Sequence, residues 1–125
     1  MKKAIIPTVC AAALLFSGCG EKQSVIPELS AAQLSLQNAN YVASLSAEEV
    51  DGKVLTAKKG SDFLAYYKLN SAEECDRLYD VVIGANPDAD VSCKYTNDEN
   101  FGNVIICGTK DALKTAGITI VKVKE

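Results

Sequence analysis

The chain has 125 residues, of which 48% are hydrophobic and 23% charged, and its formal net charge is −3. This length corresponds to one domain. The sequence contains no histidine, which excludes Ser-His-Asp and Cys-His catalysis and histidine-ligated zinc. The single arginine is Arg77, and no basic cluster is present to neutralise phosphates, so we expect no nucleic-acid partner.

The first segment of the chain is a short apolar run behind two lysines. Lys2 and Lys3 precede residues 4–16, which are thirteen residues without a charge. A transmembrane helix needs about 20 apolar residues, so the run is short for one. A positive start, a short apolar middle and small residues at its end are instead typical of a secretory signal peptide.

A cysteine directly follows the small residues that end this run. Residues 16–19 read Phe-Ser-Gly-Cys. They resemble the lipobox of bacterial lipoproteins, although that family usually has Leu at the position of Phe16. The resemblance implies that residues 1–18 are a signal peptide cleaved after Gly18. It also implies that Cys19 then carries diacylglycerol and a palmitate-type acyl chain, and no other cofactor is expected.

The residue after the cysteine bears on location. Inner-membrane lipoproteins commonly have Asp there, and this chain has Gly20, so the resemblance implies an anchor in the outer membrane, facing the periplasm. Without residues 1–18 the chain holds 11 basic and 16 acidic residues, a net charge of −5. Attachment therefore depends on acyl chains rather than on charge, because two or three chains anchor a protein stably.

A polar tether and an ambiguous segment come next. Residues 19–27 are predicted to link the lipid to one globular domain over 28–125. Within 28–50, the capping box Ser30-x-x-Gln33 favours a helix. An alternation in the same segment is equally typical of a strand; it comprises Ala39, Tyr41, Ala43 and Leu45. The sequence therefore predicts an N-terminal helix or hairpin without deciding between them.

The middle of the chain contains clearer elements. Residues 53–57 are predicted to be a short strand, and residues 62–69 a second strand with an alternating apolar face. The capping box Ser71-x-x-Glu74 begins a helix that Gly84 ends. The apolar face of this helix recurs at three- and four-residue steps; it comprises Cys75, Leu78, Tyr79, Val82 and Ile83.

Three more elements complete the prediction. Residues 90–95 and 103–108 are predicted strands, and the second is so continuously apolar that we expect it to be buried on both faces. Thr109 is expected to cap a short helix that Gly117 stops. Residues 118–124 alternate like a final strand.

The order of elements predicts an α+β fold. Residues 62–124 read β-α-β-β-α-β, which resembles the ferredoxin-like arrangement of a small antiparallel sheet with two helices on one face. The N-terminal helix or hairpin precedes it. We expect the strands 62–69 and 103–108 to be adjacent in the middle of the sheet and parallel to each other.

Three cysteines remain in the mature chain. Cys75, Cys93 and Cys107 would meet an oxidising compartment, where thiols pair, and their odd number predicts one disulfide and one free thiol. Parallel central strands would bring all three to one edge of the domain. That placement favours Cys75 paired with Cys107, with Cys93 as the other candidate. Dimerisation through the free thiol, and metal or redox chemistry, are the remaining interpretations.

No residue pattern indicates a catalytic or metal site. The acidic loops match only a fragment of a calcium-binding loop and are interpreted as solvated surface; they contain Asp88, Asp90, Asp98 and Asn100. Glu73 and Glu74 are interpreted as helix-cap residues. We therefore expect a non-enzymatic protein.

Two binding functions fit these features. The first is a lipid-anchored module that assembles with or inhibits an envelope protein, as an accessory component of an envelope, secretion or conjugation system. The second is binding of cell-wall glycan, because the element order is similar to that of the peptidoglycan-binding SPOR domain. No glycan-binding residue of that family has a matching position here. An enzyme or a thiol-redox protein is the third alternative.

Overall fold

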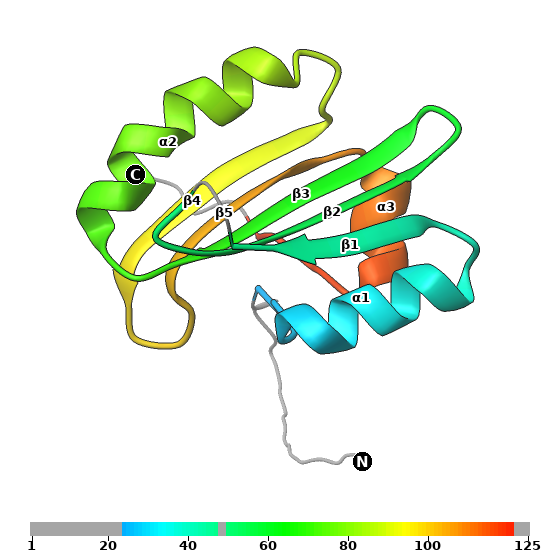
Figure 1. The fold of residues 1–125 in the computed structure, drawn as a ribbon, viewed down its shortest axis with the longest axis horizontal. Helices are drawn as coiled ribbons and strands as arrows, with labels where there is room; N and C mark the ends of the chain where they lie inside the picture. Colours follow the sequence, from blue (N-terminus) through cyan, green and yellow to red (C-terminus); the bar gives the residue numbers. More distant parts are fainter. Residues whose placement is uncertain (1–23, 48–49, 122–125) are drawn as a thin grey trace. The chain divides into compact units, whose positions relative to one another are not determined.

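The computed structural model describes residues 24–47 and 50–121, and Val25–Thr119 form a compact domain. One antiparallel sheet has the strand order β1-β2-β3-β5-β4, so the predicted α+β class is confirmed (Figure 1). The elements, in chain order, are α1 Leu29–Asn38, β1 Val42–Ser46, β2 Gly52–Lys59, β3 Asp62–Leu69, α2 Ala72–Ala85, β4 Val91–Asp98, β5 Gly102–Gly108 and α3 Lys110–Ala116.

The ambiguous N-terminal segment contains both predicted structures in succession. Leu29, Ala32 and Leu36 recur at helical spacing and are buried on one side of α1. Asn40 has a positive φ of 72° and reverses the chain, after which β1 pairs with β2 in register. The sequence left helix and strand open for this segment, and the structure has a helix in its first part and a strand in its second.

The two later helices begin differently from one another. Ser71 caps α2 as predicted, because its side chain accepts a hydrogen bond from the Glu74 N–H at 3.1 Å. Thr109 occupies the N-cap position of α3, as predicted, but its side chain makes no capping hydrogen bond. Its hydroxyl instead accepts from the Phe63 N–H at 3.2 Å, which ties the end of β5 to β3. Gly117 ends α3 in the left-handed conformation, as predicted.

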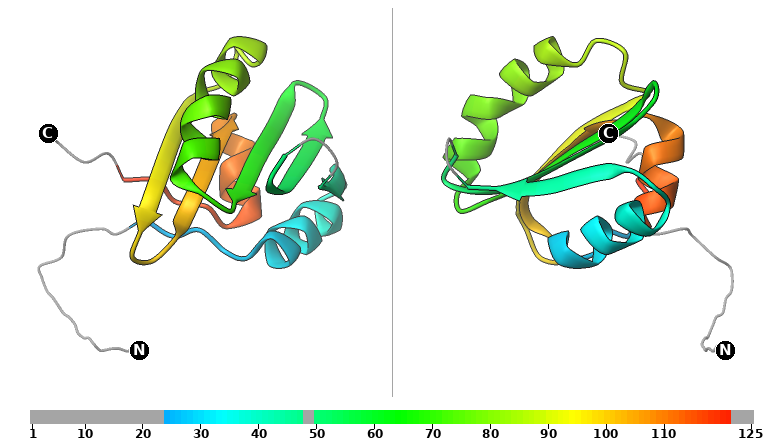
Figure 2. Two further views of the ribbon diagram at one scale, coloured as in Figure 1. Left: turned by 60° about the vertical axis from the view of Figure 1, so that its left-hand side comes forward. Right: turned by 45° about the vertical axis from the view of Figure 1, so that its right-hand side comes forward.

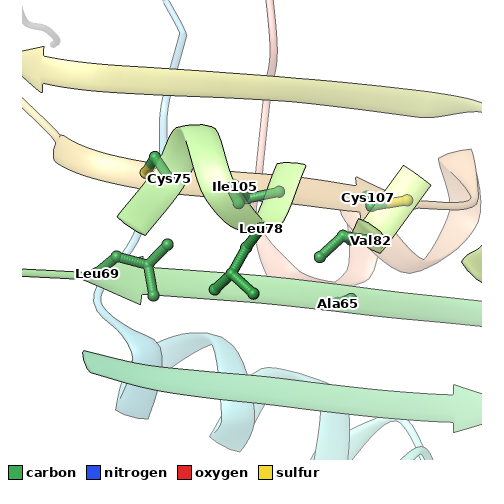
Figure 3. Close-up of a cluster of buried hydrophobic side chains, with 7 residues drawn as sticks. All are labelled: Ala65, Leu69, Cys75, Leu78, Val82, Ile105 and Cys107. Carbon is green, nitrogen blue, oxygen red and sulfur yellow. The ribbon is translucent and has the colours of Figure 1, made fainter. Parts of the chain in front are cut away.

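The helices cover opposite faces of the sheet. Figure 2 shows α2 on one face, called the α2 face below, and α1 with α3 on the other. The core under α2 joins the odd-numbered residues of β3 and β5 to the helix (Figure 3); it comprises Ala65, Leu69, Cys75, Leu78, Val82, Ile105 and Cys107. On the other face Leu64, Tyr66, Val104 and Ile106 are buried. The apolar run of β5 is thus buried on both faces, as predicted.

The ferredoxin-like expectation is met in part. The strand order β3-β5-β4, with α2 crossing from β3 to β4, matches the prediction for residues 62–108. The expected parallel pairing is wrong, because β5 runs antiparallel to β3, with Leu64 opposite Gly108 and Leu69 opposite Asn103. Since β4 and β5 form an antiparallel hairpin and α2 returns the chain in the direction of β3, β5 must oppose β3.

The second half of the arrangement also differs from the prediction. The two helices expected on one face, α2 and α3, lie on opposite faces. The place beside β3 is occupied by β2 rather than by residues 118–124. Of that predicted strand, Thr119 forms one isolated bridge with Val25, and residues 122–124 lie outside the described part of the chain.

The entry of the chain into the domain is held by hydrogen bonds. Val25 and Thr119 exchange backbone hydrogen bonds of 2.7 and 2.9 Å. The buried Tyr66 donates its hydroxyl to the Pro27 carbonyl at 2.6 Å, and burial raises the pKa of Tyr66 to about 12. The folded unit therefore already includes Val25, within the predicted tether.

Tyr66→Phe tests this attachment. We expect a loss of about 1 kcal/mol in the free energy of unfolding, because the Pro27 carbonyl loses its donor. The raised pKa means that the neutral tyrosine is favoured in the folded state. Its contribution to the free energy of unfolding is therefore fully present below pH 10 and is lost as the pH rises through about 12. Urea unfolding of both chains at neutral and alkaline pH measures the difference, and identical profiles would contradict the assignment.

Gly52→Ala tests the start of β2. Gly52 has φ +146°, and an added Cβ would lie 2.2 Å from the Lys68 carbonyl oxygen. We expect a loss of about 3 kcal/mol or more, because backbone must move. Gly60→Ala is the matched control: its φ is also positive, at +61°, but no atom lies within 4 Å of the added Cβ, so about 1 kcal/mol is expected. Equal losses in urea unfolding would refute the steric explanation.

Candidate functional site

One half of the α2 face is left uncovered by helix. The five strands span about 20 Å across the sheet, and α2 packs on β3, β4 and β5. The open surface over β1, β2 and the start of β3, bounded by the C-terminal end of α2, is called the shelf below. Its lining includes Val42, Ser44, Thr56, Lys58, Phe63, Ala65, Ala85 and Asp88.

The floor of the shelf follows from strand alternation and register. Val42 and Ser44 stand opposite Lys58 and Thr56, so their side chains share the α2 face with Ala65. The Ser44 and Thr56 hydroxyls lie 3.5 Å apart. Val42 is 80% exposed, which is a high value for a valine in a sheet. The floor is therefore a mixture of small apolar and hydroxyl groups.

The wall of the shelf is the C-terminal end of α2, where Ala85 lines it, and the same side of the helix carries Glu74 and Val81. Glu74 accepts the Asp51 N–H at 3.1 Å, which joins this side of the helix to the start of β2. Hydrogen bonds from Arg77 and from Asp51 lower the pKa of Glu74 to about 2, so the carboxylate stays charged. Val81, two turns further along the same side, is 64% exposed. A second exposed apolar side chain therefore lies one helical turn before Ala85, at the border of the shelf.

The chemistry of the shelf is that of a contact surface. Its charged lining residues are Lys58 and Asp88. Within residues 24–47 and 50–121, no three acidic or cysteine side chains gather in a way that would hold a metal.

The acidic residues noted in the sequence hydrogen-bond to loop backbone. Asp98 accepts the N–H groups of Asn100 and Phe101, and Asp90 accepts that of Lys110.

The three cysteines are free thiols in the structure. Cys75 and Cys107 are both buried under α2, whereas the half-buried Cys93 stands opposite Ile106 and lies on the other face of the sheet. Burial raises the pKa of Cys93 to about 11 and also raises that of Cys75. The bridge predicted between Cys75 and Cys107 is therefore not formed here.

The reason lies in the direction of β5. Cys75 donates its thiol hydrogen to the Tyr95 carbonyl at 3.7 Å, while Cys107 Sγ lies 3.5 Å from Ser92 Oγ. Tyr95 and Ser92 are three residues apart on one strand, about 10 Å. A disulfide needs Cα atoms within about 7 Å. Antiparallel pairing therefore places Cys75 and Cys107 at opposite ends of the contact between α2 and the sheet.

The remaining site residues predicted from the sequence fall elsewhere. Gly18 and Cys19 lie outside the described residues. Among the residues that the structure does describe, no helix has both the length and the apolarity needed to cross a membrane. The sequence gives no sign of the shelf, because a strand valine such as Val42 fits the same pattern whether it is exposed or buried.

The comparisons with known proteins identify no relative. The chain matches no protein-family profile, no curated protein and no solved structure.

Alkylation tests the state of the thiols. When the envelope-extracted protein is unfolded without reductant, we expect Cys75, Cys93 and Cys107 all to be alkylated, because no two of them are placed to pair. In the folded protein Cys93 should react first, since it alone is half exposed. Mass spectrometry of peptides counts the labels, and a single label before reduction would restore the disulfide.

Proposed function

We propose that this protein is a lipid-anchored binding module of the bacterial envelope, which assembles with or inhibits an envelope protein. The lipobox-like residues 16–19 support the anchor, and with it an outer-membrane location facing the periplasm. Val25, which is hydrogen-bonded into the domain, comes six residues after Cys19, so six residue steps separate them. Fully extended they span about 20 Å, so the domain would stay close to the membrane and meet partners held there.

The single observation that carries the binding role is the shelf. A soluble domain usually covers both faces of a sheet, and apolar residues left exposed together mark contact surfaces. Val42, at 80% exposure, lines this groove, and Val81, at 64% exposure, lies on the same side of α2 as Ala85, one turn before it, and Ala85 also lines the groove. We propose that a segment of an envelope protein lies there, with its apolar side chains on these two valines.

Glycan binding receives no comparable support. Its basis was the element order of a ferredoxin-like domain, and the second half of that order is not present here. Sedimentation with purified cell-wall sacculi remains a direct test of it.

Crosslinking in intact envelopes tests the proposed function. We expect the tagged chain to capture a protein partner identified by mass spectrometry. The double substitution Val42→Asp, Val81→Asp should reduce capture at least about tenfold, because buried carboxylates weaken an apolar contact. Leu34→Asp is the matched control, since Leu34 is 58% exposed on α1, on the other face of the sheet. Equal capture by all variants, or no protein captured, would refute the proposal.

A further inference from the structure

The outer edge of β1, at the end of the described sheet, carries outward-facing backbone groups at defined positions. The Asn70 N–H donates to the Asp51 carbonyl at 2.9 Å, so the odd-numbered residues of β2 bond toward β3. The even-numbered ones must then bond toward β1, where they oppose Val42 and Ser44. Ala43 and Leu45 consequently direct their N–H and C=O groups away from the sheet. In agreement, the Ala43 carbonyl accepts side-chain amides from Gln33 and Gln37.

The two edges of the sheet differ in how they oppose pairing with another strand. Proteins protect an edge with charged side chains and bulges. β4 has both, because it carries Lys94 and its register shifts between Tyr95 and Asp98. β1 has the uncharged sequence Val-Ala-Ser-Leu-Ser and a regular register. Its Val42 and Leu45 are 80% and 40% exposed, on opposite faces of the sheet.

We propose that two copies of this chain pair antiparallel through β1, about a two-fold axis at Ser44. In this register Ala43 exchanges both backbone hydrogen bonds with the partner subunit's Leu45, and the symmetric pair does the same. Ser44 then faces the partner subunit's Ser44 as a non-hydrogen-bonded pair, with the two side chains close together. The strand is uncharged, so two acidic chains meet without placing like charges opposite each other.

The same pairing would complete the shelf. A two-fold axis perpendicular to the sheet keeps both α2 helices on one face. The two shelves would join into a trough whose floor is four strands, about 15 Å across, with one α2 as each wall. The partner segment of the proposed function would then lie in this trough, so the inference extends that function and rests on it for the occupant. The anchor would favour pairing by concentrating copies on the membrane.

The glutamine contacts on this edge are compatible with exchange. The Gln33 and Gln37 amides lie 3.4 and 3.3 Å from the Ala43 oxygen, near the limit of a hydrogen bond, and Gln37 is exposed. Rotation of these two side chains would release the carbonyl to the incoming N–H.

Disulfide trapping tests the pairing with the lipidated full-length chain in vesicles without other proteins. Under mild oxidation we expect Ser44→Cys to form a covalent dimer, because the two thiols would face each other in a non-hydrogen-bonded pair. Ser61→Cys, in the exposed turn between β2 and β3, and Thr96→Cys, on the exposed β4, are matched controls. The unsubstituted chain reports any crosslinking through the native thiols. The proposal would be overturned if Ser44→Cys formed the dimer no faster than Ser61→Cys, or if it formed the dimer more slowly than Thr96→Cys.

Two further variants test the register. Leu45→Pro in the Ser44→Cys chain removes an outward N–H that β2 does not use, and should reduce trapping severalfold more than Leu45→Ala.

Ser44→Lys places like charges opposite each other and should shift the chain to monomer in sedimentation equilibrium, while Ser61→Lys should not. A Ser44→Lys chain as dimeric as Ser61→Lys would overturn the proposal, even if Leu45→Pro failed to fold. Failure here, with capture still dependent on Val42 and Val81, would remove the dimer and leave the proposed function standing.

Discussion

The antiparallel pairing of β3 with β5 is the constraint on which the rest of the domain depends. Both strands are buried on two faces, with Leu64 and Tyr66 on one side of β3 and Ala65 and Leu69 on the other. Each face therefore needs its own helical cover, and the chain supplies α2 on one and α1 with α3 on the other. The same pairing decides which ends of the strands meet, and thereby separates Cys75 from Cys107.

An unequal distribution of helices follows from this arrangement and produces the candidate site. One helix covers about half of a five-stranded sheet, because a helix is about 10 Å wide and five strands span about 20 Å. α1 and α3 cover their face together, whereas α2 leaves β1 and β2 open on its own face. The hydrogen bond from the Asp51 N–H to Glu74 joins the N-terminal end of α2 to the start of β2. The shelf thus follows from the absence of a second helix on this face within the described part of the chain.

Local signals in the sequence were reliable where the physical cause is also local. Ser71 caps α2 because its acceptor and the Glu74 N–H are three residues apart, and Gly117 ends α3 because its own φ is positive. Thr109 carries the same type of signal as Ser71, but its hydroxyl bonds to Phe63, 46 residues away. Val42 likewise reads as an ordinary apolar strand residue, and only the position of α2 leaves it exposed. No pattern within either segment could report these distant neighbours.

The sequence by itself determined most of the secondary-structure elements from residue 53 to residue 117, the α+β class, the burial of β5 and the lipobox-like start of the chain, because each depends on residues close together along the chain. The tertiary structure alone decided the direction of β5 against β3, the face that each helix covers, the separation of the thiols and the opening of the shelf. These depend on which distant segments exclude water from the same apolar face. That choice is made by packing across the whole domain, and neither propensity nor periodicity within a segment contains it.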